Sequence, residues 1–204
     1  MNKFSVIIPT MWFSSKIVDA IKTFNYSIHV DEILVIDNNP TESIDLSEYD
    51  KVNHIKNNSN LYVNPSWNLG VSLATNHNII LSNDDVVIRN IERVLSSDEL
   101  VSYDLVGLDY KNINKSNSVI FRKTDKDMEK GFGCFMYVNK NLYNDIPNEM
   151  KIWYGDKFLF KSIHRKSMFA CDGIEIELSK TVKKVQDLHS ILKKDEIIFS
   201  SIKF

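Results

Sequence analysis

The sequence predicts an α/β protein with a doubly wound, Rossmann-like mixed sheet that is flanked by helices and forms a single domain. Continuous apolar, β-branched runs at residues 4–9, 32–37 and 79–81 are typical of buried strands. Segments with apolar residues at helical spacing separate these runs, as in the βαβ units of a sheet covered on both faces. A length of 204 residues suits one domain with a substantial core.

The first part of the chain predicts three βα units before an acidic cluster at residues 82–85. Ser14 or Ser15 suits the N-cap of the first helix, and Pro65 suits the first turn of the second. Glycine is unusual inside a helix, so we expect that Gly70 is needed there for close packing or for binding a ligand. The expected elements are a strand at 4–9, a helix at 14–24, strands at 32–37 and 51–55, a helix at 65–74, and strands at 79–81 and 86–88.

After residue 88 the alternation of strands and helices becomes less regular. The apolar tail at residues 197–204 is expected to pack back onto the domain. The other expected elements are a helix at 91–100, strands at 103–108, 119–122 and 131–138, a short helix at 139–145, a helix at 155–165, strands at 168–171 and 174–177, and a helix at 182–192.

Composition narrows the class of protein. The net charge of -2 gives no global basic field that would attract nucleic acid or an anionic membrane. Two cysteines, Cys134 and Cys171, are too few for a disulfide framework or a cysteine-based zinc site. No signal peptide is evident, and no apolar run approaches the roughly 20 residues that span a bilayer. We therefore expect a cytoplasmic protein whose membrane contacts, if any, are peripheral.

Two adjacent carboxylates, Asp84 and Asp85, lie between the apolar runs of residues 78–88. Partly buried carboxylates must be paired with a cation or bound to a metal. The end of an interior strand is also where open α/β sheets place their ligands. A solvated turn, for which Ser, Asn and Asp are ordinary residues, is the alternative interpretation.

Six segments carry a resemblance to a known family. They are, in order, FSVIIPT, EILVIDN, PSWNLGVSLA, IILSNDD, GFGCFMYVNKNLY and WYGDKFLFKSIHRKS. In this order and spacing they resemble the inverting family-2 glycosyltransferases of the GT-A fold, over most of the chain. The resemblance implies a single glycosyltransferase domain at 1–204, with a nucleotide-sugar-binding half at 1–90 and an acceptor-binding and catalytic half at 91–204.

The resemblance also implies which residues bind the donor. Asp37 matches a position that reads the nucleotide, with strand-end capping as the alternative. Trp67 takes a place where the family often has a basic residue, which argues against a pyrophosphate contact there. The implied nucleotide-sugar-binding residues are Thr10, Asp37, Asn38, Asn68, Gly70, Ser82, Asn83 and Asp84.

A divalent cation, Mn²⁺ or Mg²⁺, is implied by the family's Asp-x-Asp motif. Its first position falls on Ser82 and its second on Asp84, with Asp85 as a further neighbour. The implied metal ligands are Asp84, Asp85 and His189, and the metal would bridge the diphosphate. With one carboxylate fewer, we expect weak metal binding without nucleotide. For His189, a position on a helix surface is the alternative.

Asp156 is the general base that the resemblance implies. The family usually has Glu-Asp or Asp-Asp here, whereas this chain has Gly155-Asp156. Trp153 and Tyr154 are expected to raise the pKa of Asp156 by desolvation and to stack on a sugar. Together with Gly133 they form the implied acceptor side. The alternative role of Asp156 is that of a helix N-cap or first-turn acid, and one residue could do both.

The function implied by the resemblance is transfer of a sugar from a UDP-linked donor to a hydroxyl acceptor with inversion. A glycan, a lipid-linked sugar, a protein and a modified DNA base are all acceptors compatible with the sequence. A sugar-phosphate nucleotidyltransferase is a second interpretation, but it needs a Gly-rich basic loop after the first strand, where this chain has Thr10-Met11-Trp12-Phe13. The changes at Ser82 and Gly155 keep open a third, a catalytically inactive nucleotide-sugar- or glycan-binding domain.

Overall fold

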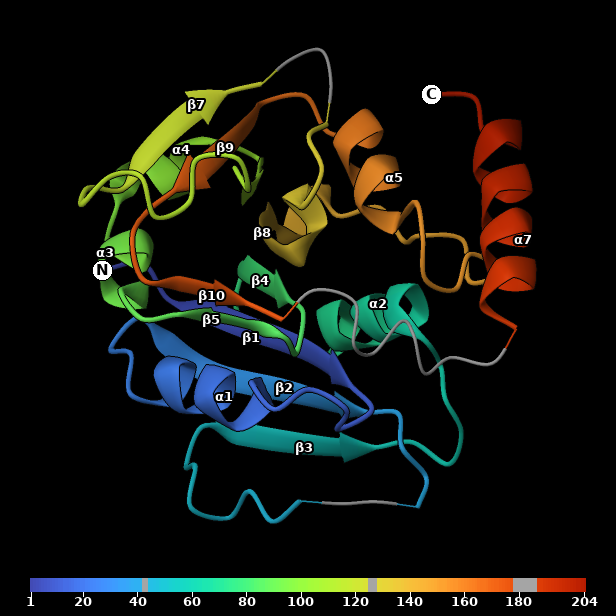
Figure 1. The fold of residues 1–204 in the computed structure, drawn as a ribbon, viewed down its shortest axis with the longest axis horizontal. Helices are drawn as coiled ribbons and strands as arrows, with labels where there is room; N and C mark the ends of the chain where they lie inside the picture. Colours follow the sequence, from blue (N-terminus) through green and yellow to red (C-terminus); the bar gives the residue numbers. More distant parts are fainter. Residues whose placement is uncertain (42–43, 125–127, 178–186) are drawn as a thin grey trace.

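The computed structural model describes residues 1–41, 44–124, 128–177 and 187–204. An eight-stranded mixed sheet with the order β3-β2-β1-β4-β8-β6-β9-β7 runs through them, and a two-stranded sheet pairs β10 with β5 (Figure 1). The strands are β1 (Phe4–Thr10), β2 (Val30–Asp37), β3 (Val52–Lys56), β4 (Asn78–Ser82), β5 (Val86–Ile88), β6 (Leu105–Leu108), β7 (Ile120–Lys123), β8 (Phe135–Asn139), β9 (Lys166–Ala170) and β10 (Ile174–Ile176). The helices are α1 (Ile17–Asn25), α2 (Val63–Leu73), α3 (Ile91–Leu95), α4 (Asp98–Ser102), α5 (Gly155–Ser162) and α7 (Leu188–Ser201), with 3₁₀ turns η1 (Phe132–Cys134) and η2 (Lys140–Leu142).

The first four strands of the large sheet are parallel. β1 lies between β2 and β4, and Thr10 is in register with Asp37 at the carboxyl ends of β1 and β2. Because parallel strands bring their carboxyl ends to one edge, the polar residues that follow β1, β2 and β4 meet there.

The antiparallel strand β8 joins the two parts of the chain. It pairs with β4 on one side, with Ser82 opposite Phe135, and with β6 on the other. This pairing brings the Gly-rich segment before β8 to the edge of the sheet where β4 ends.

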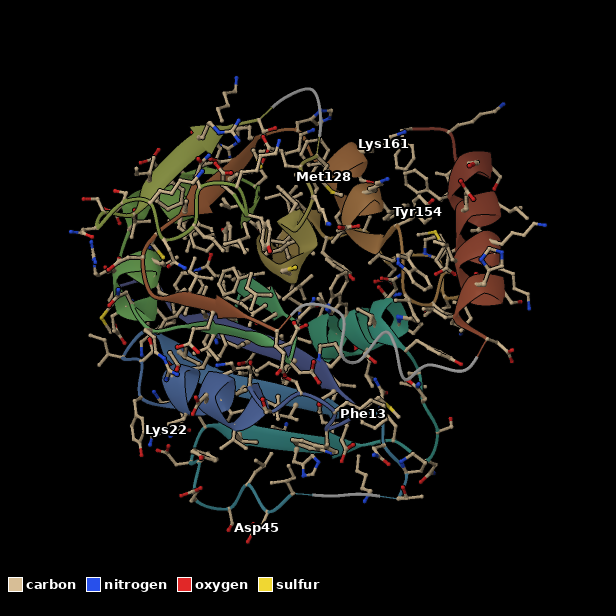
Figure 2. The ribbon with its side chains drawn as sticks, in the orientation of Figure 1. Phe13, Lys22, Asp45, Met128, Tyr154 and Lys161 are labelled. Carbon is tan, nitrogen blue, oxygen red and sulfur yellow. The ribbon has the colours of Figure 1, made fainter. Side chains whose placement is uncertain are left out.

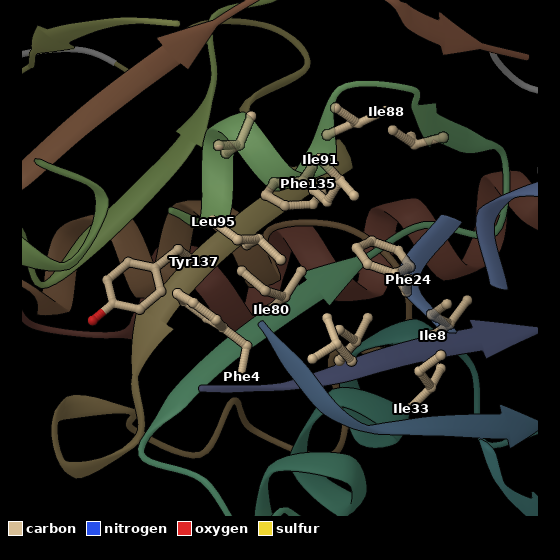
Figure 3. Close-up of a cluster of buried hydrophobic side chains, with 14 of the residues drawn as sticks. Phe4, Ile8, Phe24, Ile33, Ile80, Ile88, Ile91, Leu95, Phe135 and Tyr137 are labelled. Atoms are coloured by element: carbon tan, nitrogen blue, oxygen red, sulfur yellow. The ribbon is translucent and has the colours of Figure 1, made fainter. Parts of the chain in front are cut away.

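Successive strand residues point to opposite faces of the sheet and so belong to two hydrophobic clusters, one on each face. On the face covered by α1 and α3, Ile8 and Ile80 pack with Phe24, Ile91 and Phe135 (Figure 3). The opposite cluster, under α2 and α5, consists of side chains such as Ile7, Leu81, Trp67, Phe132 and Leu159. Helices on both faces and one mixed sheet confirm the predicted fold class.

Gly70 has a packing reason. A Cβ at this position would lie 2.4 Å from Cγ2 of Ile7, so only glycine lets α2 approach β1 this closely.

Two predicted helices are wrong in extent. The segment at 91–100 forms two short helices instead of one, because Ser96 and Ser97 take turn bonds to Glu92 and Val94 and the backbone at Ser97 is extended. At 139–145 only the 3₁₀ turn η2 forms, with the Asn139 side chain accepting the amide of Asn141.

Further boundaries differ from the prediction. The strand expected from residue 131 starts at Phe135, because Gly131 has a φ of 85° and opens a 3₁₀ turn. α5 ends at Ser162 because Ile163 is extended, and β9 then begins at Lys166. The N-cap of α1 is Lys16 rather than Ser14 or Ser15, although Ser14 Oγ accepts the amide of Lys16.

The C-terminal helix was predicted only in part. Residues 182–186 lie outside the described chain, and α7 extends from Leu188 to Ser201, through much of the apolar tail. Its Ile198 and Phe199 pack against the cluster under α2 and α5, as the tail was expected to do. None of the helices that the structure describes is long and apolar enough to cross a membrane.

Candidate functional site

A pocket of about 400 Å³ opens at the edge of the sheet where β1 and β4 end. It collects residues from both parts of the chain, which the sequence separates by up to 147 positions (Pro9 to Asp156). Its lining includes Thr10, Met11, Asn38, Asn60, Tyr62, Trp67, Asn83, Asp84, Asp85, Tyr110, Lys130, Gly133, Cys134, Trp153, Tyr154 and Asp156. Nine of the predicted site residues are thereby brought together: Thr10, Asn38, Asn83, Asp84, Asp85, Gly133, Trp153, Tyr154 and Asp156.

Asp84 ties the ends of β1 and β4 together. Its Oδ2 accepts a hydrogen bond of 2.7 Å from Thr10 Oγ1, which in turn accepts the amide of Trp12. The carboxyl group is buried, and this burial raises the pKa of Asp84 to about 6 despite the bond from Thr10.

Asp85 lies beside Asp84 and is also buried. Burial and the charge of Asp84 raise the pKa of Asp85 to about 7, with a smaller contribution from Glu177. Oδ1 of Asp85 is buried and has no hydrogen-bond partner among the described residues. A pair of carboxylates with raised pKa values and an unpartnered oxygen fits a hard divalent cation, which prefers oxygen ligands.

His189 is not assembled with this pair. It lies exposed in the first turn of α7 and does not line the pocket. Within residues 1–41, 44–124, 128–177 and 187–204, no three His, Cys, Asp or Glu side chains form a group that could hold a metal. His189 lies on the surface of a helix, where the alternative interpretation placed it.

Asn38 links three segments around the pocket. Its Nδ2 donates to Ser66 Oγ on α2, and its Oδ1 accepts from Asn57 Nδ2 and from the amide of Leu61. The neighbouring Asp37 does not line the pocket. Asp37 is fully buried, with Oδ1 accepting the amide of Asn39 and Oδ2 lying 2.9 Å from His54 Nε2, the arrangement of a strand-end cap.

Asn68, Gly70 and Ser82 lie outside the pocket lining. Asn68 anchors the segment after β8, because its Oδ1 accepts from Tyr143 Oη and from the amide of Ile146. Ser82 is fully buried and donates to the carbonyl oxygen of Asn83. A nucleotide contact at these three residues stays a prediction.

Asp156 lies in the first turn of α5 and faces the pocket from the second half of the chain. The N-cap of α5 is Tyr154, so the N-cap interpretation of Asp156 is wrong. Burial raises the pKa of Asp156, and the amide and charge of Lys157 lower it in part. A Cβ at Gly133 would lie 2.6 Å from Asp156 Oδ2, so glycine there leaves room for the carboxylate.

Tyr62, Tyr110 and Lys130 line the pocket but were not predicted from the sequence. Tyr62, like the predicted Tyr154, has a positive φ (67° and 65°), which is a strained backbone for bulky side chains and is typical of functional sites. No local pattern signals a positive φ at a tyrosine, so the sequence carried no clue.

Cys134 is no nucleophile, because burial raises the pKa of its thiol to about 12.

No protein-family model and no curated protein matches the sequence. Solved structures of S. aureus TarS do match in three dimensions. TarS 1-349 with UDP-GlcNAc gives a TM-score of 0.61 at 13% identity, covering 99% of this chain and 68% of that one. The complex of TarS 1-349 with UDP gives 0.57 at 12% identity, covering 98% and 72%. A longer TarS structure gives 0.62 at 13% identity, covering 98% of this chain and 44% of that one. The likeness confirms the predicted GT-A type of α/β fold; membership of family 2 stays a prediction.

Proposed function

We propose that the protein is a glycosyltransferase that moves a sugar from a UDP-linked donor to a hydroxyl acceptor with inversion, assisted by a divalent cation. The observation that carries the proposal is one pocket in which the pair Asp84–Asp85 and the carboxylate of Asp156 come from different halves of the chain. The UDP and UDP-GlcNAc complexes of TarS, which has the same fold, support the choice of donor.

The residues of the first half would hold the donor. Thr10 fixes Asp84 at the end of β4, and Asn38 and Asn83 add polar groups to the same side of the pocket. Asp84 and Asp85 would hold Mn²⁺ or Mg²⁺, which supplies positive charge against the leaving diphosphate. The two carboxylates must be ionised to do so, and a cation favours that state.

Asp156 would act as the general base. Its carboxylate accepts the proton of the acceptor hydroxyl while the acceptor oxygen forms a bond to the anomeric carbon. The bond from that carbon to the diphosphate breaks, and the electron pair leaves with UDP. The raised pKa of Asp156 makes it a better proton acceptor than an exposed aspartate. A single displacement needs no enzyme nucleophile, which agrees with the protonated state of Cys134.

Aromatic side chains would shape the acceptor side. Trp153, Tyr154, Tyr62 and Tyr110 line the pocket around Asp156. Their faces suit stacking on the apolar face of a sugar, and the exclusion of water strengthens the hydrogen bonds of the reacting groups.

A catalytically inactive nucleotide-sugar-binding domain is the second candidate. Ser82 in place of the first motif carboxylate and Gly155 in place of the acid before Asp156 favour it. A nucleotidyltransferase is disfavoured, because β1 ends at Thr10 and continues into Met11-Trp12-Phe13 rather than into a Gly-rich basic loop.

Two measurements on the intact chain test the proposal. Calorimetry with UDP, with ADP as the control nucleotide, should show Mn²⁺-dependent binding of UDP. Release of UDP from UDP-GlcNAc with water as acceptor should then be detectable. Binding without release would favour the inactive domain, and no binding of any nucleotide would overturn both candidates.

A further inference from the structure

Asp195 is a fully buried carboxylate on α7, outside the pocket described above. It accepts three hydrogen bonds from consecutive backbone amides. Oδ1 accepts from Lys151 N at 2.8 Å, and Oδ2 accepts from Ile152 N and Trp153 N, both at 2.9 Å. Such a set of amide donors satisfies both oxygens of the buried carboxyl group and fixes the backbone that supplies them.

Asn64 of α2 donates hydrogen bonds to the carbonyl oxygens of the same segment. Its amide N–H donates to Lys151 O, and its Nδ2 donates to Met150 O and Trp153 O. Residues 150–153 are thus fixed from two directions. Asp195 accepts from the amides of residues 151–153, and Asn64 donates to the carbonyl oxygens of Met150, Lys151 and Trp153, so most of this backbone is satisfied without a helix or sheet.

The fixed stretch leads directly into the pocket. Ile152, Trp153 and Tyr154 line it, and Asp156 follows in the first turn of α5. Tyr154 adopts a φ of 65°, a conformation that persists only where its surroundings determine it. Helix α7 also contacts this segment. The ring of Tyr154, which lies between α5 and α7 in Figure 2, stacks on the ring of Phe199 with the ring centroids 5.0 Å apart.

We propose that Asp195 is a positioning residue for catalysis: by holding the amides of residues 151–153, it sets Trp153, Tyr154 and Asp156 at the acceptor side of the pocket. The inference rests on the proposed function. The proposed donor-binding residues Thr10, Asn38 and Asp84 lie at or just after the ends of sheet strands, and the side-chain hydrogen bonds described for them do not involve Asp195. Loss of Asp195 therefore reduces turnover and leaves UDP binding in place.

The test uses the full chain with Asp195→Asn and Asp195→Ala, and with Asp187→Asn as the matched control. Asp187 is the exposed N-cap of the same helix in a left-handed conformation that asparagine accepts. Three quantities are measured well below the melting temperature of each variant. They are the UDP affinity with Mn²⁺, the rate of UDP release from UDP-GlcNAc, and hydrogen exchange at the amides of residues 151–153.

We expect UDP affinity within about threefold of wild type in both Asp195 variants. Turnover should fall by about a hundredfold in Asp195→Ala, the order of loss caused by a misplaced catalytic group. Asn keeps one acceptor oxygen, so Asp195→Asn should fall less and rescue part of the rate. Exchange at the three amides should speed up in both variants and stay slow in Asp187→Asn.

The outcomes separate the two proposals. A wild type that binds UDP, with unchanged turnover in Asp195→Asn and Asp195→Ala, would overturn the positioning role and leave the proposed function intact. Equal losses of UDP affinity and turnover would also overturn it, because they indicate a general structural role. A wild type that neither binds UDP nor releases it would overturn the proposed function and this inference with it. If Asp195→Ala does not fold, the nearly isosteric Asp195→Asn decides the test.

Discussion

The side chain of Asn64 occupies the space that a residue larger than glycine would need at position 155. A Cβ at Gly155 would lie 2.1 Å from Asn64 Oδ1 and 2.7 Å from Asn64 Cγ. The acid that the resemblance to family-2 glycosyltransferases implies before Asp156 therefore has no room at position 155. Asn64 fills that place instead, and its Nδ2 binds the backbone that precedes Asp156.

Gly155→Ala should destabilise the protein by about 1–3 kcal/mol, the usual cost of overpacking a close contact. The measurement is urea unfolding of Gly155→Ala, Asn64→Ala and the double variant. Because the two residues touch, the double variant should be more stable than the sum of the single effects predicts, by about 1 kcal/mol. Strict additivity of the two losses would show that Asn64 does not set the limit at position 155.

Asp156→Asn should keep the affinity for UDP and lose turnover by about 10²- to 10⁴-fold, the usual contribution of a general base. Calorimetry and the UDP-release assay measure the two quantities. Asp145→Asn, which changes an exposed loop acid in the same half of the chain, is the matched control and should behave as wild type. Turnover retained in Asp156→Asn would assign the base to another group.

The rate of UDP release should rise with pH as Asp156 loses its proton. Because burial raises the pKa of Asp156, the midpoint of this rise should lie above 3.8, the ordinary value for aspartate. The assay is a pH–rate profile at saturating donor and Mn²⁺. A midpoint at or below the ordinary value would mean that the carboxylate that limits the rate is a solvated one.

The pair Asp84–Asp85 should make the fold less stable as pH rises in the absence of divalent cations. Their pKa values in the folded protein, about 6 and about 7, exceed the ordinary 3.8. Between the ordinary pKa value and the raised values, the folded state binds more protons than the unfolded state, so the free energy of unfolding falls as pH rises. Thermal melting in a chelator should show this fall, with Asp85→Asn about 1–3 kcal/mol more stable than wild type at neutral pH.

Added Mn²⁺ should raise the melting temperature of wild type at neutral pH, because the cation binds the ionised pair only in the folded state. The gain should be smaller in Asp85→Asn and in Asp84→Asn, each of which removes one charged ligand. UDP should increase the gain in wild type, since a diphosphate adds oxygen ligands. Equal gains in wild type and both variants would place the cation elsewhere.

Much of the framework follows from local sequence. The runs that form β1, β2 and β4 each contain a continuous apolar stretch, so their burial and their parallel arrangement could be predicted. Thr10 at the end of β1 and Asp84 after β4 were predicted because the family resemblance matches them to binding positions, which lie at the ends of buried strands.

The contacts that hold the segment before Asp156 could not be predicted. Asn64 contacts Gly155 across 91 positions of sequence, and Asp195 binds amides that are 42 to 44 residues away. Such contacts depend on how helices pack, which no local periodicity records. The metal role implied for His189 stays a prediction. α7 carries this histidine at an exposed position, outside the lining of the pocket.

The pairing of β4 with β8 limits how this protein can move. Asp84 follows β4, and Asp156 is positioned against Gly133, just before β8. The two carboxylates therefore lie against neighbouring strands of one hydrogen-bonded sheet, not in two domains joined by a hinge. We therefore expect any closure over a bound substrate to come from loops outside the sheet and not from the rotation of a domain.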